Sequence, residues 1–319
     1  MRALVVGGGS WGTAFACVLA RGGHTVTLAC RDPGPLLRDR ENHRYLPGVP
    51  LEAGVTPQDL ELAAQCAEAE LVVLALPSGS TVEVGRQLTG SAPVLLLAKG
   101  LDPLSSGLLS DQLEGIAGPV AVLSGPNHAE EIGRGQPAAA VLASADLEVA
   151  RALQRAIALP AFRLYASPDV RGVQLAGASK NVIAIASGAA DALGFGDNAR
   201  AALMTRGLAE MTRLGVALGA DPRTYSGLAG MGDLIATCTS RHSRNRRAGE
   251  LLAGGTDPAE LETAVGMTVE GVHTAPRLRR LAADAGIELP ITEAVCAVLD
   301  GLPVRQAIPL LLERALADE

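Results

Sequence analysis

The segment Gly7-Gly8-Gly9-Ser10-Trp11-Gly12 is the strongest indication of the fold, because its glycines have the spacing G-x-G-x-x-G. It follows the apolar run 3–6 and precedes an uncharged segment, 13–20, that is typical of a buried helix ending at Arg21. The run 25–30 then completes a strand–helix–strand unit of roughly 30 residues. In this context Gly7, Gly9 and Gly12 allow a tight turn and close approach of a pyrophosphate to the N-terminus of the helix. The sequence therefore predicts dinucleotide binding, with a purely structural glycine turn as the alternative.

The first half of the chain alternates short apolar runs with segments typical of helices. This alternation predicts an α/β domain with a mostly parallel, Rossmann-like sheet, covered on both faces and binding ligands at the carboxyl ends of its strands. Pro77, Lys99 and Gly125 are expected to follow strands directly and to lie at that edge. The predicted strands are 3–6, 25–30, 71–76, 94–98 and 120–123, with 137–142 and 162–165 as extensions of the sheet.

After about Asp169 the strand pattern gives way to Ala- and Leu-rich stretches with helical spacing. We expect one such helix to begin after a cap at Asn198 and to end at Gly219. We predict a dinucleotide-binding domain over 1–170 and an all-α, substrate-binding domain over 171–319. The sequence does not decide the oligomeric state, and a homo-oligomer formed through the Ala- and Gly-rich helical half is possible.

Composition excludes several classes of protein. A formal net charge of -7 disfavours nucleic acid as a partner. Five scattered cysteines fit neither a disulfide framework nor a zinc site, so we expect a cytoplasmic protein without a metal. The uncharged run 3–20 superficially resembles a signal peptide or membrane anchor, but its glycines interrupt any apolar helix. We expect neither export nor membrane insertion.

Three kinds of charged residue suggest the chemistry. Arg31 follows the second strand, where a guanidinium can bind the 2′-phosphate of NADPH. The neighbouring Asp32 leaves use of NAD as an open alternative. Arg31 could also be a solvated surface arginine without a role in binding. Lys99 and Lys180 are the only lysines among 27 basic residues. We expect a cleft between the domains to bring them together, with Lys180 donating a proton to a reduced carbonyl, although both lysines could be retained by chance.

Residues around Lys180 and in a later arginine-rich segment complete the candidate site. Asn181 is expected to bind a substrate hydroxyl or fix the lysine amine, and Asp233 to orient Lys180 or accept a substrate hydroxyl, although helical Asn and Asp after glycine are often structural. Within an acidic protein, Arg241, Arg244, Arg246 and Arg247 form a basic patch suited to a phosphate dianion. A solvated helix face or a subunit contact is the alternative for that patch.

Ordered motifs run across essentially the whole chain. They are GGGSWGT at 7–13, NHRYLPG at 42–48, AKGL at 98–101, SGPNHA at 124–129, ASKNVI at 178–183, GLAGMGDLIAT at 227–237, SRHSRNRR at 240–247 and VEG at 269–271. Together these motifs resemble those of bacterial NAD(P)-dependent glycerol-3-phosphate dehydrogenases. The resemblance implies reversible reduction of dihydroxyacetone phosphate to sn-glycerol 3-phosphate, usually for phospholipid synthesis.

The resemblance also implies roles for individual residues. Lys180 matches the proton donor and acceptor, assisted by Lys99 and Asp233. Asn127 departs from the Ser or Thr frequent in similar sequences. Cofactor contacts are implied for Ser10, Trp11, Arg31, Tyr45, Lys99, Ala129, Arg244 and Glu270, and substrate contacts for Lys99, Gly125, Asn127, Asp233, Ser243, Arg244 and Asn245.

Two other functions fit parts of this pattern. Hydroxyacid, phosphogluconate and ketopantoate reductases also pair lysine with asparagine, but SRHSRNRR after GMGDL favours a phosphate-bearing substrate. A non-catalytic NADPH-sensing module would bind the cofactor and would not need Lys180. Addition of dihydroxyacetone phosphate to protein and NADPH distinguishes both from the main prediction.

Overall fold

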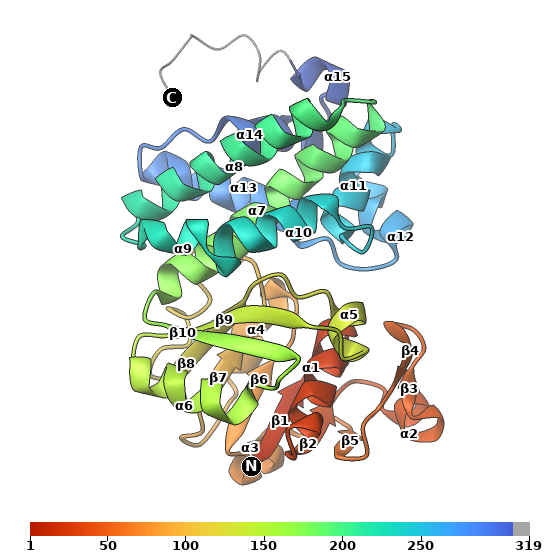
Figure 1. Cartoon of the computed structure of the whole chain (residues 1–319), viewed down its shortest axis with the longest axis vertical. Coiled ribbons are helices and arrows are strands. Elements are labelled where there is room, and N and C mark those ends of the chain that lie inside the picture. Colours follow the sequence, from red (N-terminus) through yellow and green to blue (C-terminus); the bar gives the residue numbers. More distant parts are fainter. Residues whose placement is uncertain (309–319) are drawn as a thin grey trace. The chain divides into compact units, whose positions relative to one another are not determined.

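The computed structural model describes residues 1–308 and divides into two compact units (Figure 1). The first comprises Met1–Asp102 and Gly107–Gln174, and the second comprises Pro103–Ser106 and the chain from Leu175. The division falls inside the long helix α7, Val170–Ala192. The assignment of cofactor and substrate to the predicted domains 1–170 and 171–319 stays a prediction.

The first unit is built on an eight-stranded sheet with the order β10-β9-β8-β7-β6-β1-β2-β5. Neighbouring strands pair in parallel except β8 and β9, which are antiparallel. A separate antiparallel hairpin, β3–β4, follows the second strand. The strands are β1 (Arg2–Val6), β2 (Thr25–Ala29), β3 (Glu41–Asn42), β4 (Leu46–Pro50), β5 (Val55–Gln58), β6 (Leu71–Leu74), β7 (Val94–Leu96), β8 (Val120–Ser124), β9 (Ala138–Ser144) and β10 (Phe162–Ser167).

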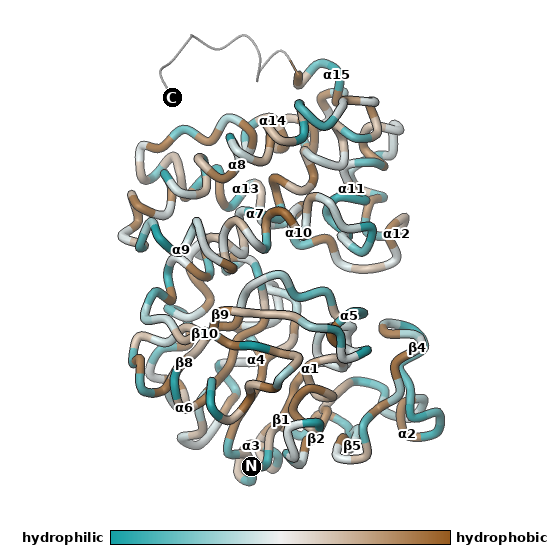
Figure 2. The backbone as a smooth tube through the Cα atoms, viewed as in Figure 1, coloured by the Kyte–Doolittle hydropathy of each residue, from teal (hydrophilic) through white to brown (hydrophobic). Residues whose placement is uncertain are grey.

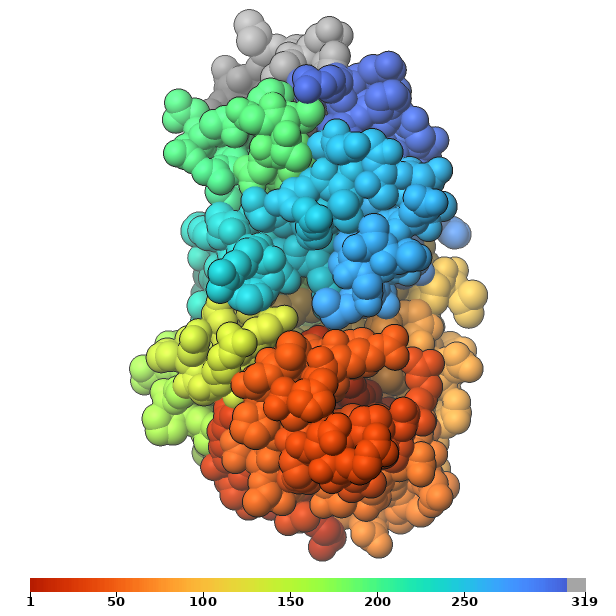
Figure 3. All heavy atoms as spheres, turned by 90° about the vertical axis from the view of Figure 1, so that its right-hand side faces the viewer, coloured from red at the N-terminus to blue at the C-terminus, as the bar shows by residue number. Residues whose placement is uncertain are grey.

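The core of this unit forms because the central strands are apolar on both faces, as strands between helical layers must be. Every residue of β6 is buried, and the side chain of Phe15 from α1 meets that of Phe162 edge-on, with ring centroids 6.5 Å apart. Brown, hydrophobic colouring follows α1 in Figure 2. In Figure 3 the red and orange atoms of the early elements cover much of the first unit on the visible face. The helices are α1 (Ser10–Arg21), α2 (Gly34–Asp39), α3 (Leu62–Glu68), α4 (Ser78–Gly85), α5 (Ala129–Gly133) and α6 (Leu147–Ile157).

The described part of the second unit is helical, and with the mostly parallel sheet it confirms the predicted fold class. Its core gathers apolar side chains from α7, α8 and α10 around Tyr225, which is 1% exposed. After α7 the elements are α8 (Asp197–Ala217), α9 (Pro222–Ser226), the π-helical turn η1 (Leu228–Gly232), α10 (Asp233–Thr239), α11 (Arg244–Ala253), the 3-10 turn η2 (Pro258–Glu260), α12 (Leu261–Val265), α13 (Glu270–Asp284), α14 (Pro290–Leu299) and α15 (Val304–Ala307).

Several predicted boundaries were wrong. Asn198 does not cap α8: the N-cap is Gly196, and Asp197 already lies in the first turn. Gly219 does follow the end of this helix, with a left-handed φ of 86°. Pro77 and Lys99 do not follow strands directly, because strand pairing stops at Leu74 and Leu96. Lys180 lies near the middle of α7, which is the first helix of the helical half.

Candidate functional site

The glycine loop joins β1 to α1, and its glycines have different roles. Gly7 has a φ of 118°, and a Cβ there would strike the carbonyl of Ala75. A Cβ on Gly12 would strike the carbonyl of Gly7, so the turn and the close packing of the helix require both glycines. A Cβ on Gly9 would meet nothing within 4 Å. The open space at Gly9, the N-cap of α1, fits a pyrophosphate approaching the start of the helix.

Asn42 fixes this loop from the β3–β4 hairpin. Its Nδ2 donates to the Gly8 carbonyl (2.9 Å) and to Thr13 Oγ1 (2.8 Å), while its Oδ1 accepts from the Tyr45 N–H (3.2 Å). The residue is 3% exposed. Asn42 therefore connects the glycine loop to the segment of Tyr45, a predicted cofactor contact. Sequence reasoning assigned no function to Asn42, although the residue opens the NHRYLPG motif.

Two further predicted cofactor positions lie in the first unit. Arg31 and Asp32 are both exposed just after β2, on the sheet neighbour of β1. Ala129 begins α5 and is buried against Leu46, Val49 and the partly buried Trp11. The placement of Arg31 at the carboxyl end of β2 is compatible with its predicted contact to a ribose phosphate.

Lys99 and the loop after β8 form a second cluster in this unit. Lys99 Nζ donates to the Gly125 carbonyl at 2.7 Å. Gly125 has a φ of 145°, and a Cβ there would lie 3.0 Å from Ala140 Cα, so this position requires glycine. Asn127 Nδ2 donates to the Ala139 carbonyl (3.3 Å), whereas its buried Oδ1 has no hydrogen-bond partner. A buried acceptor of this kind is suited to a ligand that donates a hydrogen bond.

Lys180 lies in a buried polar cluster of the second unit. Its Nζ donates to Asp233 Oδ1 and, at 2.7 Å, to Thr237 Oγ1. Lys180 is 5% exposed and Asp233 1%. The Thr237 hydroxyl donates to the Asp233 carbonyl (2.6 Å), which leaves its oxygen to accept from the lysine. The start of α10 thus holds the ammonium group of Lys180 with a carboxylate and a hydroxyl.

Thr237 was not among the predicted site residues. It stands four residues after Asp233, and residues at that spacing share one face of a helix. That spacing within GLAGMGDLIAT was the available signal. The prediction that Lys99 and Lys180 meet stays a prediction, because the two lysines belong to different units.

Two asparagines form a neighbouring cluster in the second unit. Asn245 Nδ2 donates to Asn181 Oδ1 (2.9 Å), and Asn245 Oδ1 accepts from the Gly271 N–H (2.8 Å). These contacts join α7, α11 and the first turn of α13, which begins at Glu270. Asn181 and Glu270 are therefore connected through one side chain and the adjoining backbone.

Fewer arginines of the predicted basic patch are available to an anion than the sequence suggested. Arg246 pairs with Asp191 (2.8 Å) and Glu250 (2.9 Å), and Arg247 also pairs with Glu250 (3.1 Å). Arg244 is exposed at the first position of α11, and its Nη1 donates to the Thr268 carbonyl. Ser243 is the N-cap of that helix and accepts from the N–H of Arg246 (3.2 Å). Arg244 is thus better placed than Arg246 to meet an anion.

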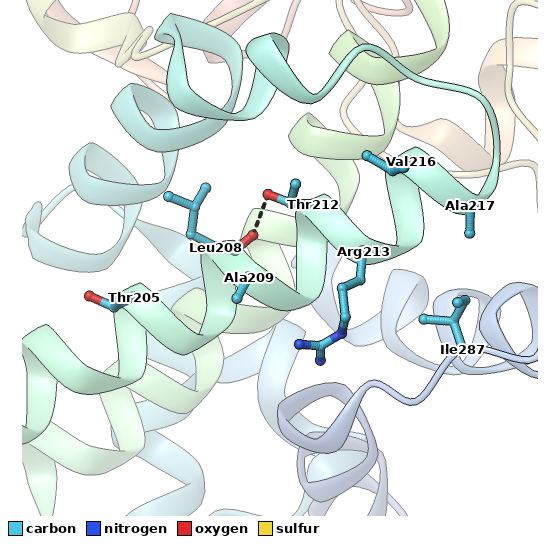
Figure 4. Close-up of a pocket in the computed structure, with 8 residues that line it drawn as sticks. All are labelled: Thr205, Leu208, Ala209, Thr212, Arg213, Val216, Ala217 and Ile287. Carbon is cyan, nitrogen blue, oxygen red and sulfur yellow. Dashed lines mark hydrogen bonds between the residues drawn. The ribbon is translucent and has the colours of Figure 1, made fainter. Parts of the chain in front are cut away.

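Three other features bear on what the molecule binds. No group of three or more His, Cys, Asp and Glu side chains able to hold a metal occurs among residues 1–308. In the same residues, no helix is both long and apolar enough to cross a membrane. A groove of about 720 Å³ runs along α8, lined by Leu208, Val216 and Ile287 among others (Figure 4), but none of its lining residues belongs to the predicted site.

Comparison with known proteins identifies the family. The model for the NAD-dependent glycerol-3-phosphate dehydrogenase N-terminus matches residues 3–150, and the model for the C-terminus matches residues 169–309. The chain belongs to this family. A glycerol-3-phosphate dehydrogenase [NAD(P)+] of Moorella thermoacetica is 50% identical over 99% of this chain and 96% of that relative. The family confirms the predicted resemblance and the predicted nicotinamide cofactor.

Solved structures agree with this membership. Glycerol-3-phosphate dehydrogenase from Coxiella burnetii has a TM-score of 0.93 and 37% identity, covering 98% of this chain and 99% of that one. A ketopantoate reductase family protein from Ralstonia eutropha shares the fold at a TM-score of 0.61 with 18% identity, covering 97% of this chain and 100% of that one. The chain therefore shares its fold with a ketopantoate reductase family protein, one of the alternatives considered from the sequence. Its sequence, however, is similar to those of glycerol-3-phosphate dehydrogenases.

Proposed function

We propose that this chain catalyses the reversible, NAD(P)H-dependent reduction of dihydroxyacetone phosphate to sn-glycerol 3-phosphate. The observation that carries the proposal is the buried cluster of Lys180, Asp233 and Thr237 in a member of this dehydrogenase family. Reduction of a ketone needs a proton at the developing alkoxide, and a lysine ammonium can polarise the carbonyl oxygen and then supply that proton. In the reverse direction the same amine accepts the proton.

The first unit, in this proposal, binds the dinucleotide. Gly9 leaves room for the pyrophosphate, Asn42 holds the loop, and Arg31 favours the 2′-phosphate of NADP while NAD remains accepted. Ser10, Trp11, Tyr45, Ala129 and Glu270 are the further proposed contacts. When bound, the reduced nicotinamide supplies the hydride. No assignment here requires a metal.

The substrate is assigned mainly to residues of the second unit. Arg244 is proposed to bind the phosphate, because it is exposed at the first turn of a ten-residue helix and carries a permanent charge. Asn181 is proposed to hydrogen-bond a substrate oxygen. From the first unit, Lys99 adds positive charge and the unpartnered Asn127 Oδ1 offers an acceptor for a substrate hydroxyl. The preferred direction, toward sn-glycerol 3-phosphate for phospholipid synthesis, is part of the proposal.

A panel of substrates tests the proposal. NADPH absorbance is followed with purified protein and dihydroxyacetone phosphate, ketopantoate or a simple 2-oxo acid. We expect oxidation with dihydroxyacetone phosphate and none above background with the others. Oxidation only with an acid substrate would favour the related reductases, and cofactor binding without oxidation of any substrate would favour an NADPH-sensing module.

A further inference from the structure

The segment between α12 and α13 contains a peptide group whose two polar atoms both have side-chain partners in the second unit. The N–H of Val269 donates to Glu262 Oε1 at 2.8 Å, and the carbonyl of Thr268 accepts from Arg244 Nη1 at 3.1 Å. These two atoms belong to the same peptide bond, which joins Thr268 to Val269. Glu262 on α12 and Arg244 on α11 are therefore connected through one peptide group.

The geometry of a peptide makes this connection directional. The bond between Thr268 and Val269 is trans, so the group is planar and its N–H and C=O point in opposite directions. The Glu262 carboxylate, by fixing the N–H, therefore also fixes the direction of the Thr268 carbonyl. A hydrogen bond to a carboxylate is stronger than one between neutral groups. It also polarises the peptide, which makes the carbonyl oxygen a better acceptor for a guanidinium.

Glu262 is itself held by the elements on either side of this segment. Its Oε1 also contacts His273 Nε2 on α13 at 2.9 Å, and its backbone carbonyl accepts from the Gly266 N–H at 2.8 Å. Gly266 ends α12 with a left-handed φ of 77°, and Val269, the N-cap of α13, is 0% exposed. The turn between the two helices is thus short and fixed at both ends, and the Glu262 side chain decides how its last peptide group is oriented.

We propose that Glu262 is a positioning residue that acts on Arg244 through the peptide group between Thr268 and Val269. It holds the Thr268 carbonyl so that the guanidinium of Arg244 is oriented toward the phosphate of the substrate. The contact with Thr268 involves one of the five N–H groups of a guanidinium, so a phosphate can still be bound by a pair of the others. This inference rests on the proposed function, in which Arg244 binds the phosphate.

Glu262→Ala removes the acceptor that holds the peptide group. The Arg244 guanidinium must then be ordered when the phosphate binds, which costs side-chain entropy. We expect the KM for dihydroxyacetone phosphate to rise by about tenfold, the value of one hydrogen bond to a charged group. The KM for dihydroxyacetone, which lacks the phosphate, should change little. The kcat should also change little, because the cluster around Lys180 is not altered.

Two further variants identify the route of the effect, and a third is the control. Glu262→Gln keeps an oxygen that can accept from the Val269 N–H, so most of the lost binding should return. If Glu262 acts through Arg244, then Glu262→Ala should add almost nothing to the rise in KM caused by Arg244→Ala. The control is Glu260→Ala, the same exchange at an exposed position in the preceding 3-10 turn, which should leave both KM and kcat unchanged.

Hydrogen exchange at the Val269 amide tests the same contact without turnover. Exchange should be faster in Glu262→Ala than in the wild-type protein, and Glu262→Gln should slow it again. Equal rates in Glu262→Ala and the wild-type protein would show that the carboxylate does not hold this peptide group, and would overturn the inference. An inactive wild-type protein would contradict the proposed function, whereas the exchange rates would still decide whether Glu262 holds the peptide.

Three kinetic results would also overturn the inference. Equal increases in KM for dihydroxyacetone phosphate and dihydroxyacetone would show that the loss does not concern the phosphate. Multiplication of the two increases in the double variant would show that Glu262 and Arg244 act independently. An equally large increase in Glu262→Gln and Glu262→Ala would show that the hydrogen bond to Val269 is not the cause.

Discussion

Replacement of Lys180 by alanine should affect both turnover and folding, because the lysine belongs to a buried ion pair. The change leaves the carboxylate of Asp233, 1% exposed, without its cation. Removing one partner of a buried pair typically costs about 3–5 kcal/mol in the free energy of unfolding. Loss of the proton donor should lower kcat by about 10²–10⁴. Denaturant unfolding and NADPH oxidation with dihydroxyacetone phosphate measure the two effects separately.

A second exchange tells these effects apart. Adding Asp233→Asn to the Lys180→Ala variant removes the stranded charge, so most of the lost stability should return while kcat stays low. Thr237→Val, which removes a neutral acceptor from Lys180 Nζ, is the matched comparison and should cost less stability. A stable Lys180→Ala protein would refute the importance of the ion pair for folding. Recovery of turnover in the double variant would refute the assignment of Lys180 as proton donor.

Four other residues give further predictions. Arg31→Ala should raise the KM for NADPH more than the KM for NADH, and an unchanged ratio would leave Arg31 as a surface residue. Arg244→Ala should raise the KM for dihydroxyacetone phosphate far more than that for dihydroxyacetone, whereas equal losses would contradict its phosphate contact. Asn42→Ala should weaken the binding of NADPH and of NADH about equally, by roughly tenfold in Kd, which corresponds to about 1.4 kcal/mol. Fluorescence titration measures both Kd values. Weaker binding of only one dinucleotide would refute the role of Asn42 in holding the loop. Burial raises the pKa of Glu210 to about 7, so this carboxyl group binds its proton more tightly in the folded state than in the unfolded state. The free energy of unfolding should therefore fall by about 3 kcal/mol as the pH rises from 4.5 to 7. Glu210→Gln should remove that part of the fall, and an unchanged pH dependence of unfolding would contradict the shifted pKa.

The parts of the fold that sequence predicted best depend on local pattern. The glycine loop was identifiable because strand, turn and helix follow one another within a single unit. Strand ends were less accurate, since pairing with neighbours decides where a strand stops: β7 ends at Leu96, opposite Val122, although its apolar run continues. The prediction of an Asn198 cap was wrong because Gly196 has the extended backbone of an N-cap, although a glycine has no side chain that could give a cap hydrogen bond.

Residues whose roles depend on distant contacts were harder to predict. Asn42 reaches Gly8 across 34 positions, and Asn245 reaches Asn181 across 64. No local periodicity contains such contacts, and a single asparagine in a sequence is often part of an ordinary turn. The positive charge available in the arginine segment was overestimated for the same reason. Asp191, which pairs with Arg246, lies 55 positions away in the sequence. Charge counted along the sequence did not reveal its neutralising partner.

Identification of the reaction product tests most directly whether this chain reduces dihydroxyacetone phosphate. Purified protein is incubated with NADPH and dihydroxyacetone phosphate, and sn-glycerol 3-phosphate is quantified beside the loss of NADPH absorbance. We expect one molecule of sn-glycerol 3-phosphate for each NADPH oxidised, and almost none of this product in the Lys180→Ala, Asp233→Asn double variant. Oxidation of NADPH without this product, or no oxidation at any pH tested, would contradict the proposed function.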